Sequence, residues 1–167
     1  MNLYILRHGI AVERGTPGFK MDADRPLTPK GRRQLRRVAN SLGKMDLRFD
    51  LILSSPFLRA RQTAETVAKS LKLKKSLAFS DELTPDGDPK GLIRQLNELK
   101  PAPGNVLLVG HEPYLSQFIA RLISRGSDVA IDFKKGGLCK LETDSLRFGR
   151  CARLIWLLTP KQMKLMT

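Results

Sequence analysis

The sequence has little of several features that mark common protein classes. Aromatic residues make up only 6% of the 167 residues, and no stretch interleaves them with basic residues as single-strand nucleic-acid binders do. No apolar run approaches the ~18 residues of a membrane span, and the start, MNLYILR, lacks the basic region and long apolar core of a signal peptide. We therefore expect a cytoplasmic protein with no membrane segment and no nucleic-acid partner.

The motifs of several enzyme classes are also missing. The two histidines lie far apart and no HxxxH or CxxC spacing occurs, so we expect no metal ion and no other cofactor. A GxxxxGK(S/T) loop is absent, which disfavours ATP use, and no GxSxG elbow surrounds Ser54 or Ser55, which disfavours a serine hydrolase. The two cysteines, Cys139 and Cys151, are expected to be free thiols in a reducing compartment.

Acidic residues are few compared with basic ones. The chain has 30 lysines and arginines against 16 aspartates and glutamates, a formal net charge of +14. The basic residues are spread along the chain and do not form one tail. Such a balance indicates an anionic partner. Nucleic acid, an anionic membrane and a phosphorylated substrate all fit it, and charge alone does not choose among them.

Short apolar runs alternate with helical patterns, without an internal repeat or a linker, so we expect one domain over residues 1–167. Continuous runs of Leu, Ile and Val predict buried strands. Proline after Thr, Ser or Asp marks the helix starts. The predicted strands are 2–7, 50–54, 105–110, 129–143 and 152–159, and the predicted helices are 28–43, 56–72, 88–99 and 113–125. This alternation predicts an α/β fold, a three-layer αβα sandwich with a mostly parallel sheet.

The predicted helix 28–43 has one strongly basic face. Leu35, Val38 and Leu42 form its apolar stripe. The other face carries Arg32, Arg33, Arg36 and Arg37, which form like-charge pairs four residues apart and so oppose helix formation slightly. This face is interpreted either as an ordinary solvated surface or as a docking surface for an acidic protein.

Both histidines come directly after predicted buried strands. His8 stands in Arg7-His8-Gly9 after the first strand, and His111 follows NVLLVG. A third strand runs into a segment that contains Arg59. Ligands of such folds bind beyond the carboxyl ends of the strands, so we expect these side chains to meet at one rim of the sheet.

This set of side chains suits phosphoryl transfer. A neutral imidazole is a nucleophile at neutral pH, and nearby arginines lower the pKa of His8 and keep it neutral. The transition state spreads negative charge over three oxygens, which guanidinium groups bind with paired hydrogen bonds. Gly9 lacks a Cβ, so its backbone can approach a phosphate closely.

Three segments in this order resemble the signatures of the histidine phosphatase superfamily, which has the phosphoglycerate-mutase-like fold. They are Arg7-His8-Gly9, SSPFLRARQTAE from Ser54, and VGHEP around His111. The short chain and the strings RPLTPKG and ELTPDGD further resemble the SixA-type phosphohistidine phosphatases. The resemblance implies that His8 is the nucleophile that becomes a phosphohistidine. It also implies that Arg7, Arg59 and His111 bind the phosphoryl oxygens.

The general acid is less defined. Glu82 falls about where the superfamily acid lies, and Asp22 is a second candidate by its position in SixA-type chains; either carboxylate could instead serve the structure or face solvent. A phosphohistidine substrate needs little from a carboxylate, because its imidazole leaving group is readily protonated. The long loop from Gly9 to Pro26 either folds over the pocket or is disordered, and Arg25 at its end is a candidate substrate contact.

Three hypotheses follow, and the first is preferred. The chain is a protein phosphohistidine phosphatase, a monomer whose partner is a phosphohistidine-bearing protein such as a phosphorelay domain. Alternatively, it hydrolyses a small phosphomonoester with the same residues. The third hypothesis is a non-catalytic basic module that binds phosphate groups, which the intact set of His8, Arg59 and His111 disfavours.

Overall fold

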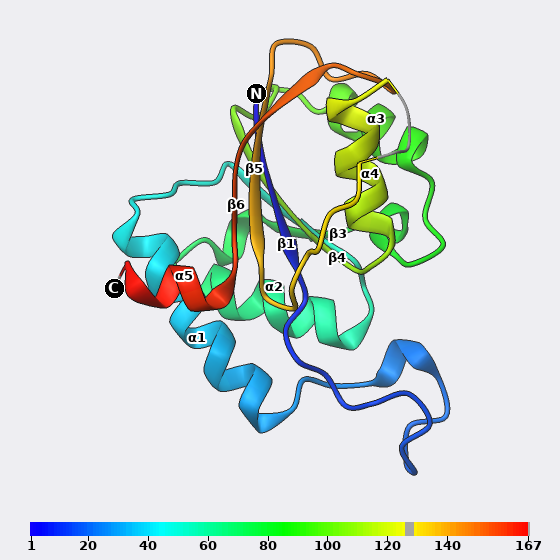
Figure 1. Cartoon of the computed structure of the whole chain (residues 1–167), viewed down its shortest axis with the longest axis vertical. Coiled ribbons are helices and arrows are strands. Elements are labelled where there is room, and N and C mark those ends of the chain that lie inside the picture. The colour runs from blue at the N-terminus through cyan, green and yellow to red at the C-terminus, as the bar shows by residue number, and fades with distance from the viewer. Residues whose placement is uncertain (126–128, 167) are drawn as a thin grey trace.

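A six-stranded mixed sheet forms the centre of the molecule (Figure 1). The computed structural model describes residues 1–125 and 129–166. The strand order is β3-β2-β4-β1-β5-β6, in which the first four strands are parallel and the last two run antiparallel to their neighbours. The strands are β1 (Asn2–Arg7), β2 (Leu51–Ser54), β3 (Leu77–Phe79), β4 (Asn105–Gly110), β5 (Leu138–Thr143) and β6 (Ala152–Leu158). The predicted mostly parallel sheet is confirmed; the domain predicted over 1–167 includes 126–128 and 167, which lie outside the described residues.

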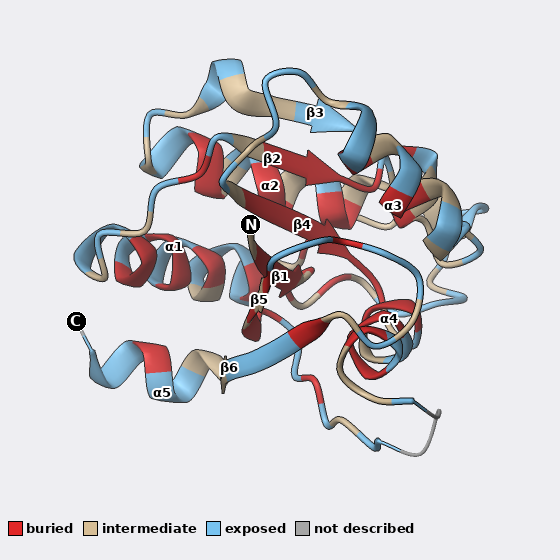
Figure 2. Cartoon of the chain, turned by 90° about the horizontal axis from the view of Figure 1, so that it is seen from above, coloured by how far each residue is buried: buried red, intermediate tan, exposed pale blue. Residues whose placement is uncertain are grey.

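Helices cover both faces of this sheet, which gives the predicted three layers (Figures 1 and 2). One face carries α1 (Pro29–Lys44), α2 (Leu58–Ser70) and α5 (Pro160–Leu165), and the other carries α3 (Pro89–Glu98) and α4 (Tyr114–Ile123). Three short 3-10 turns are η1 (Asp22–Asp24), η2 (Lys74–Ser76) and η3 (Asp81–Leu83).

The central strand β1 is buried on both faces and separates two apolar clusters. Leu3 and Ile5 belong to the cluster under α3 and α4, whereas Tyr4 and Leu6 belong to the cluster under α1 and α2. Successive residues of a strand point to opposite faces, so a fully apolar run such as NLYILR supplies both clusters at once. This two-sided burial fixes β1 in the sheet and so fixes the position of the residues that follow it.

Several predicted bounds are wrong. The strand expected over 129–143 forms only from Leu138, because the segment before it is irregular, buries Phe133 and turns at Gly136, whose φ is +76°. The helix expected from Pro56 begins at Leu58. Neither β3 nor α5 was predicted: β3 has three residues, two of them exposed, and α5 begins at a Thr-Pro pair like those that mark the other helix starts.

The cysteines are free, as expected, and Cys139 is buried in the core. Within residues 1–125 and 129–166, no helix is long and apolar enough to cross a membrane.

Candidate active site

The carboxyl ends of β1 and β4 place the two histidines side by side. Arg7, the last residue of β1, pairs in register with Gly110, the last residue of β4, so His8 and His111 leave the sheet at the same level. The backbone N–H of His8 donates to the carbonyl of Gly110 at 3.1 Å. The two imidazole rings have their centroids 5.1 Å apart. The meeting of the histidines at one rim, expected from sequence, is therefore present in the structure.

The ring of His8 is oriented by its neighbour. Its Nδ1 lies 2.7 Å from the carbonyl oxygen of Gly9. A carbonyl oxygen can only accept, so Nδ1 carries the hydrogen and Nε2 keeps its lone pair. His8 is only 7% exposed. Burial lowers its pKa to about 3, with Arg59 and Arg7 adding to the effect and the Gly9 hydrogen bond opposing it. His8 is thus a neutral imidazole at pH 7 with Nε2 available as a nucleophile.

Two arginines lie near His8, and one of them contacts this nitrogen. Arg59, in the first turn of α2, is 3% exposed, and its Nε lies 3.3 Å from Nε2 of His8. Arg7 ends β1, and its Nη1 donates to the carbonyl of Phe133. The buried Nε of Arg7 has no hydrogen-bond partner among the described residues. Buried donors are normally paired, so this N–H is a natural contact for an anionic ligand.

The imidazole of His111 is hydrogen-bonded to Ser55, a residue that was not predicted to belong to the site. The hydroxyl oxygen of Ser55 lies 2.8 Å from Nε2 of His111 and accepts a hydrogen bond from the backbone N–H of Phe57. Nδ1 of His111 is buried and has no partner within the described part of the chain. Burial lowers the pKa of His111 to about 2, with smaller contributions from His8 and Arg59. Ser55 is the first residue after β2, just as His8 and His111 are the first residues after β1 and β4. This shared position is the feature of the sequence from which Ser55 could have been predicted.

Asp22 and His8 both contact the guanidinium group of Arg59. The turn η1 brings its carboxylate Oδ2 to 2.8 Å from Nη2 of Arg59 and its backbone oxygen to 2.7 Å from Nη1. The other carboxylate oxygen accepts from Arg25 and Arg14. Burial raises the pKa of Asp22, but the hydrogen bonds from Arg25 and Arg59 outweigh this and lower the pKa to about 2. Asp22 is therefore ionised at neutral pH and is a weak proton donor there.

Glu82, the other candidate acid, is bonded to the start of α3. Its carboxylate accepts from the backbone N–H of Asp88 at 2.9 Å and packs against Gly91. The turn η3 that carries it lies beside the end of β4. Among the described contacts, Glu82 touches neither histidine of the site. Its carboxylate instead caps the start of α3.

The two predicted substrate contacts, Arg25 and Gly9, have different surroundings in the structure. Arg25 is mostly buried, with its side chain bonded to Asp22 and to the carbonyl of Val12. Gly9 is close-packed: a Cβ there would come within 2.6 Å of the Leu35 side chain, and its N–H donates to the hydroxyl of Thr63. Glycine therefore fits this position because of close packing, in addition to the expected approach of a phosphate.

The loop after Gly9 folds over the rim and is held at its base. A bridge pairs Ala11 with Leu27, and the N–H of Val12 donates to the carbonyl of Pro26 at 2.9 Å. The η1 turn of this loop contacts α2. Of the two expectations for the loop, the structure therefore shows the ordered one.

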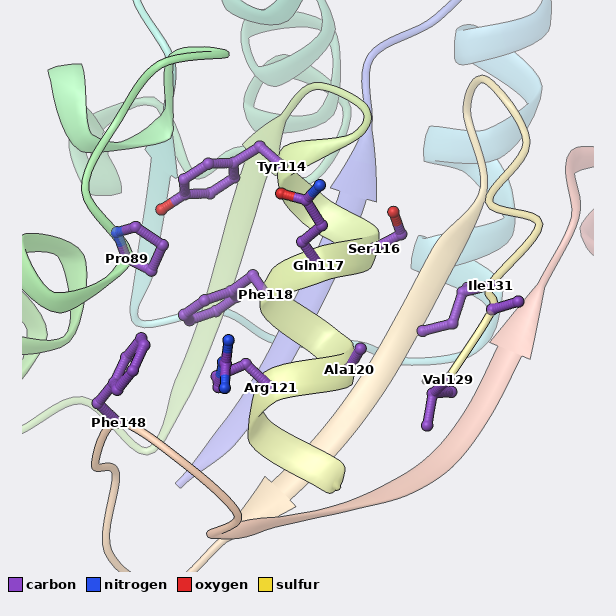
Figure 3. Close-up of a pocket in the computed structure, with 11 residues that line it drawn as sticks. Pro89, Tyr114, Ser116, Gln117, Phe118, Ala120, Arg121, Val129, Ile131 and Phe148 are labelled. Atoms are coloured by element: carbon purple, nitrogen blue, oxygen red, sulfur yellow. The ribbon is translucent and has the colours of Figure 1, made fainter. Parts of the chain in front are cut away.

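A separate pocket of about 550 Å³ lies on the outer side of α4 (Figure 3). Tyr114, Phe118 and Arg121 of α4 line it together with Phe148 from the β5–β6 loop. None of the candidate catalytic residues lines this pocket. Within the described residues, no group of three or more His, Cys, Asp or Glu side chains could hold a metal ion. We therefore place the chemistry at the strand ends, where a neutral imidazole and two guanidinium groups converge.

Comparisons with known proteins identify the family of the chain. A family model described as the histidine phosphatase superfamily (branch 1) matches residues 3–84. The chain is 36% identical over 148 residues to an uncharacterized protein of Picosynechococcus, which covers 88% of each chain. It is 36% identical over 124 residues to the phosphohistidine phosphatase SixA of Escherichia coli, which covers 73% of this chain and 74% of that one.

The fold also matches that of a solved structure. A structure of the protein histidine phosphatase SixA complexed with tungstate has a TM-score of 0.81 and 30% identity, and the match covers 98% of this chain and 100% of that one. The chain therefore belongs to the histidine phosphatase superfamily, in which it is a phosphatase of the SixA type.

Proposed function

We propose that the chain is a protein phosphohistidine phosphatase that works through a covalent phosphohistidine on His8. The observation that carries this proposal is the environment of His8: Nδ1 is bonded to Gly9, so the lone pair is on Nε2, and Nε2 lies against Arg59. A nucleophile that stays unprotonated at neutral pH, next to permanent positive charge, is what attack on a phosphoryl group requires.

The reaction has two steps. Nε2 of His8 attacks phosphorus, and the P–N bond to the substrate histidine breaks as that imidazole takes up a proton. Arg7 and Arg59 bind the equatorial oxygens, and Nδ1 of His111 donates to one of them. Water then attacks phosphorus, the bond to Nε2 breaks, and phosphate leaves with His8 neutral again.

The surroundings of the two candidate acids favour phosphohistidine over a phosphate ester. Asp22 is ionised and paired with arginines, and Glu82 is bonded to the start of α3. An alkoxide leaving group needs a proton at the moment of bond breaking, whereas imidazole is a good leaving group once protonated from solvent. A site without a ready proton donor is therefore better suited to the weak P–N bond.

Phosphate release tests this proposal. It is measured from an acidic histidine-phosphotransfer domain phosphorylated on histidine, and from an aryl phosphate, for the wild type and for His8→Ala. Ser54→Ala serves as the control, because this buried hydroxyl donates only to the neighbouring Ser55 carbonyl. We expect preferential release from the phosphoprotein, its loss in His8→Ala, and an acid-labile, alkali-stable phosphoryl label on wild-type protein quenched during turnover.

Each other outcome has a distinct meaning. A preference for the aryl ester assigns the chain to small phosphomonoesters. Unchanged activity in His8→Ala overturns the nucleophile assignment. Lack of release from either substrate, with phosphate still bound, supports a non-catalytic phosphate-binding module.

A further inference from the structure

The outward side of α1 is basic and has no partner in the described structure. We call Lys30, Arg32, Arg33, Arg36 and Arg37 the basic face. All five side chains are exposed, and within residues 1–125 and 129–166 none of them forms a hydrogen bond, an ion pair or a ring contact. No acidic residue occurs in the sixteen residues of α1. The positive charge of this face is therefore not neutralised within the described chain.

This arrangement works against the helix that carries it. Arg32 and Arg36 form one like-charge pair four residues apart, and Arg33 and Arg37 form another. Cations near the amino end of a helix are also disfavoured by the helix dipole, and Lys30, Arg32 and Arg33 stand in or next to the first turn. Solubility requires only charge, which a mixture of signs would supply without either cost.

The start of α1, which carries the basic face, lies at the end of the sheet where β1 ends, and His8 directly follows β1 (Figure 1). The first turn of α1 packs on the loop after the nucleophile: Thr28 donates to the carbonyl of Ile10, and Gly31 packs so closely on that carbonyl that a Cβ would overlap it. One turn further, Gln34 lies beside Gly136, whose N–H donates to the backbone carbonyls of Arg7 and His8. The first two turns of α1 therefore lie beside the backbone that carries His8.

We infer that the basic face docks an acidic surface of the protein that carries the phosphohistidine, an inference that rests on the proposed function. His8 is almost fully buried, so a protein that delivers a phosphoryl group to it must lie across the rim that surrounds it. The lysine and arginine excess of the whole chain would repel a basic partner and attract an acidic one. The basic face carries no aromatic side chain on which a nucleobase could stack, which favours a protein over single-stranded nucleic acid.

The test compares two pairs of charge reversals that change the net charge equally. Arg32→Glu with Arg36→Glu alters the basic face. Lys74→Glu with Lys75→Glu is the matched control, since both lysines are exposed in η2, which precedes β3 and so lies at the opposite end of the parallel strands from His8. A thermal melt first shows that each variant is folded. We expect the Arg pair to be about as stable as the wild type, because the two substituted side chains again form a like-charge pair while acidic groups near the amino end of α1 suit the helix dipole.

We expect the Arg pair to lower kcat/KM for the phosphorylated acidic histidine-phosphotransfer domain at least tenfold, mainly through KM, and to leave aryl phosphate turnover within twofold. The wild-type kcat/KM on the phosphoprotein should fall as salt rises from 50 to 200 mM, and this dependence should be weaker in the Arg pair. The Lys control should retain the wild-type values.

Other results separate the two proposals. If the wild type does not release phosphate from the phosphoprotein, the proposed function is wrong and the docking proposal falls with it. If the wild type does so and the Arg pair behaves like the Lys control, the docking proposal alone is wrong. It is also wrong if the Arg pair keeps full phosphoprotein turnover while losing retention on duplex RNA or on phosphatidylserine vesicles, because the basic face then serves that partner.

Discussion

Asp22 occupies the guanidinium group that the phosphoryl group is proposed to use, and Asp22→Asn should therefore tighten the binding of phosphate-like anions. The carboxylate and the backbone oxygen of Asp22 take both terminal nitrogens of Arg59, at 2.8 and 2.7 Å. With a pKa lowered to about 2, this carboxyl group is ionised at any ordinary assay pH. A bound anion must displace the carboxylate or tolerate it nearby, and asparagine removes that charge with little change in size.

The magnitude follows from two opposing effects. Two unit negative charges about 5 Å apart repel by about 3 kcal/mol at an effective dielectric constant near 20. Against this, asparagine gives up a charge-assisted hydrogen bond that helps to hold Arg59 in place, a loss of about 1.5–3 kcal/mol of which part remains with the amide oxygen. The net gain in anion binding is about 1–2 kcal/mol, which is roughly a 5- to 30-fold lower inhibition constant.

The assay is competitive inhibition by orthovanadate and by inorganic phosphate. Asp24→Asn is the matched control, since this residue stands in the same η1 turn, is exposed, and loses the same charge. Its inhibition constants should equal those of the wild type. Weaker or unchanged inhibition in Asp22→Asn, with the control at the wild-type value, would refute the reasoning and show that Asp22 orders Arg59 for the ligand.

Three further predictions concern the site and the stability of the fold around it. Ser55→Ala should lower kcat/KM by about 10- to 100-fold, the equivalent of one buried hydrogen bond to an imidazole, while Ser54→Ala stays within about threefold; equal losses in both variants would make the effect structural. Gly43→Ala should stabilise the fold by about 1 kcal/mol because its Cβ meets only ordinary contact. Gly31→Ala should destabilise the fold by about 1–3 kcal/mol because a Cβ would lie 2.0 Å from a backbone oxygen. Urea unfolding measures the free energy of unfolding of both glycine variants. A change of the same sign in the two variants would contradict the packing argument. Burial is the main cause that lowers the pKa of His8 to about 3 and that of His111 to about 2. The unfolded chain therefore takes up protons first as pH falls below about 6.5, and the free energy of unfolding should drop by about 2 kcal/mol between pH 6.5 and 5.5; a flat profile in phosphate-free buffer would show that the histidines are not buried as described.

The parts of the fold that sequence reasoning placed well are those dictated by burial on two faces. The runs NLYILR and NVLLVG have no polar face, so they had to be central strands, and their bounds are those observed. Once the strands were placed, the positions of His8 and His111 followed, since residues directly after parallel strands gather at one rim. In contrast, β3 has three residues with two of them exposed, and neither length nor periodicity distinguishes such a segment from a loop.

The contacts within the site depend on distances that no local pattern contains. Ser55-Pro56 has the composition of a helix start, yet the helix begins at Leu58 and the hydroxyl of Ser55 is bonded to His111. Glu82 was a candidate acid because of its place in the chain, but its carboxylate reaches the start of α3 only because η3 turns it there. A side-chain bond between residues on different strands is decided by tertiary packing, and the sequence shows only which residues are available for it.

The proposed roles of the site residues have a consequence for substrate selection. In the proposed reaction Arg7, Arg59 and the two histidines contact only the phosphoryl group of the substrate, so they would bind the same group on any carrier that fits the rim. Discrimination between carriers must then come from surfaces outside the phosphoryl pocket, because specificity is a difference between binding free energies and the pocket contributes equally to both. Among the described residues, the basic face of α1 is a charged surface next to the nucleophile loop with no partner in the described chain. If selection operates there, protein turnover depends on salt and on α1 while turnover of a small ester depends on neither, which separates recognition of the carrier from the chemistry at His8.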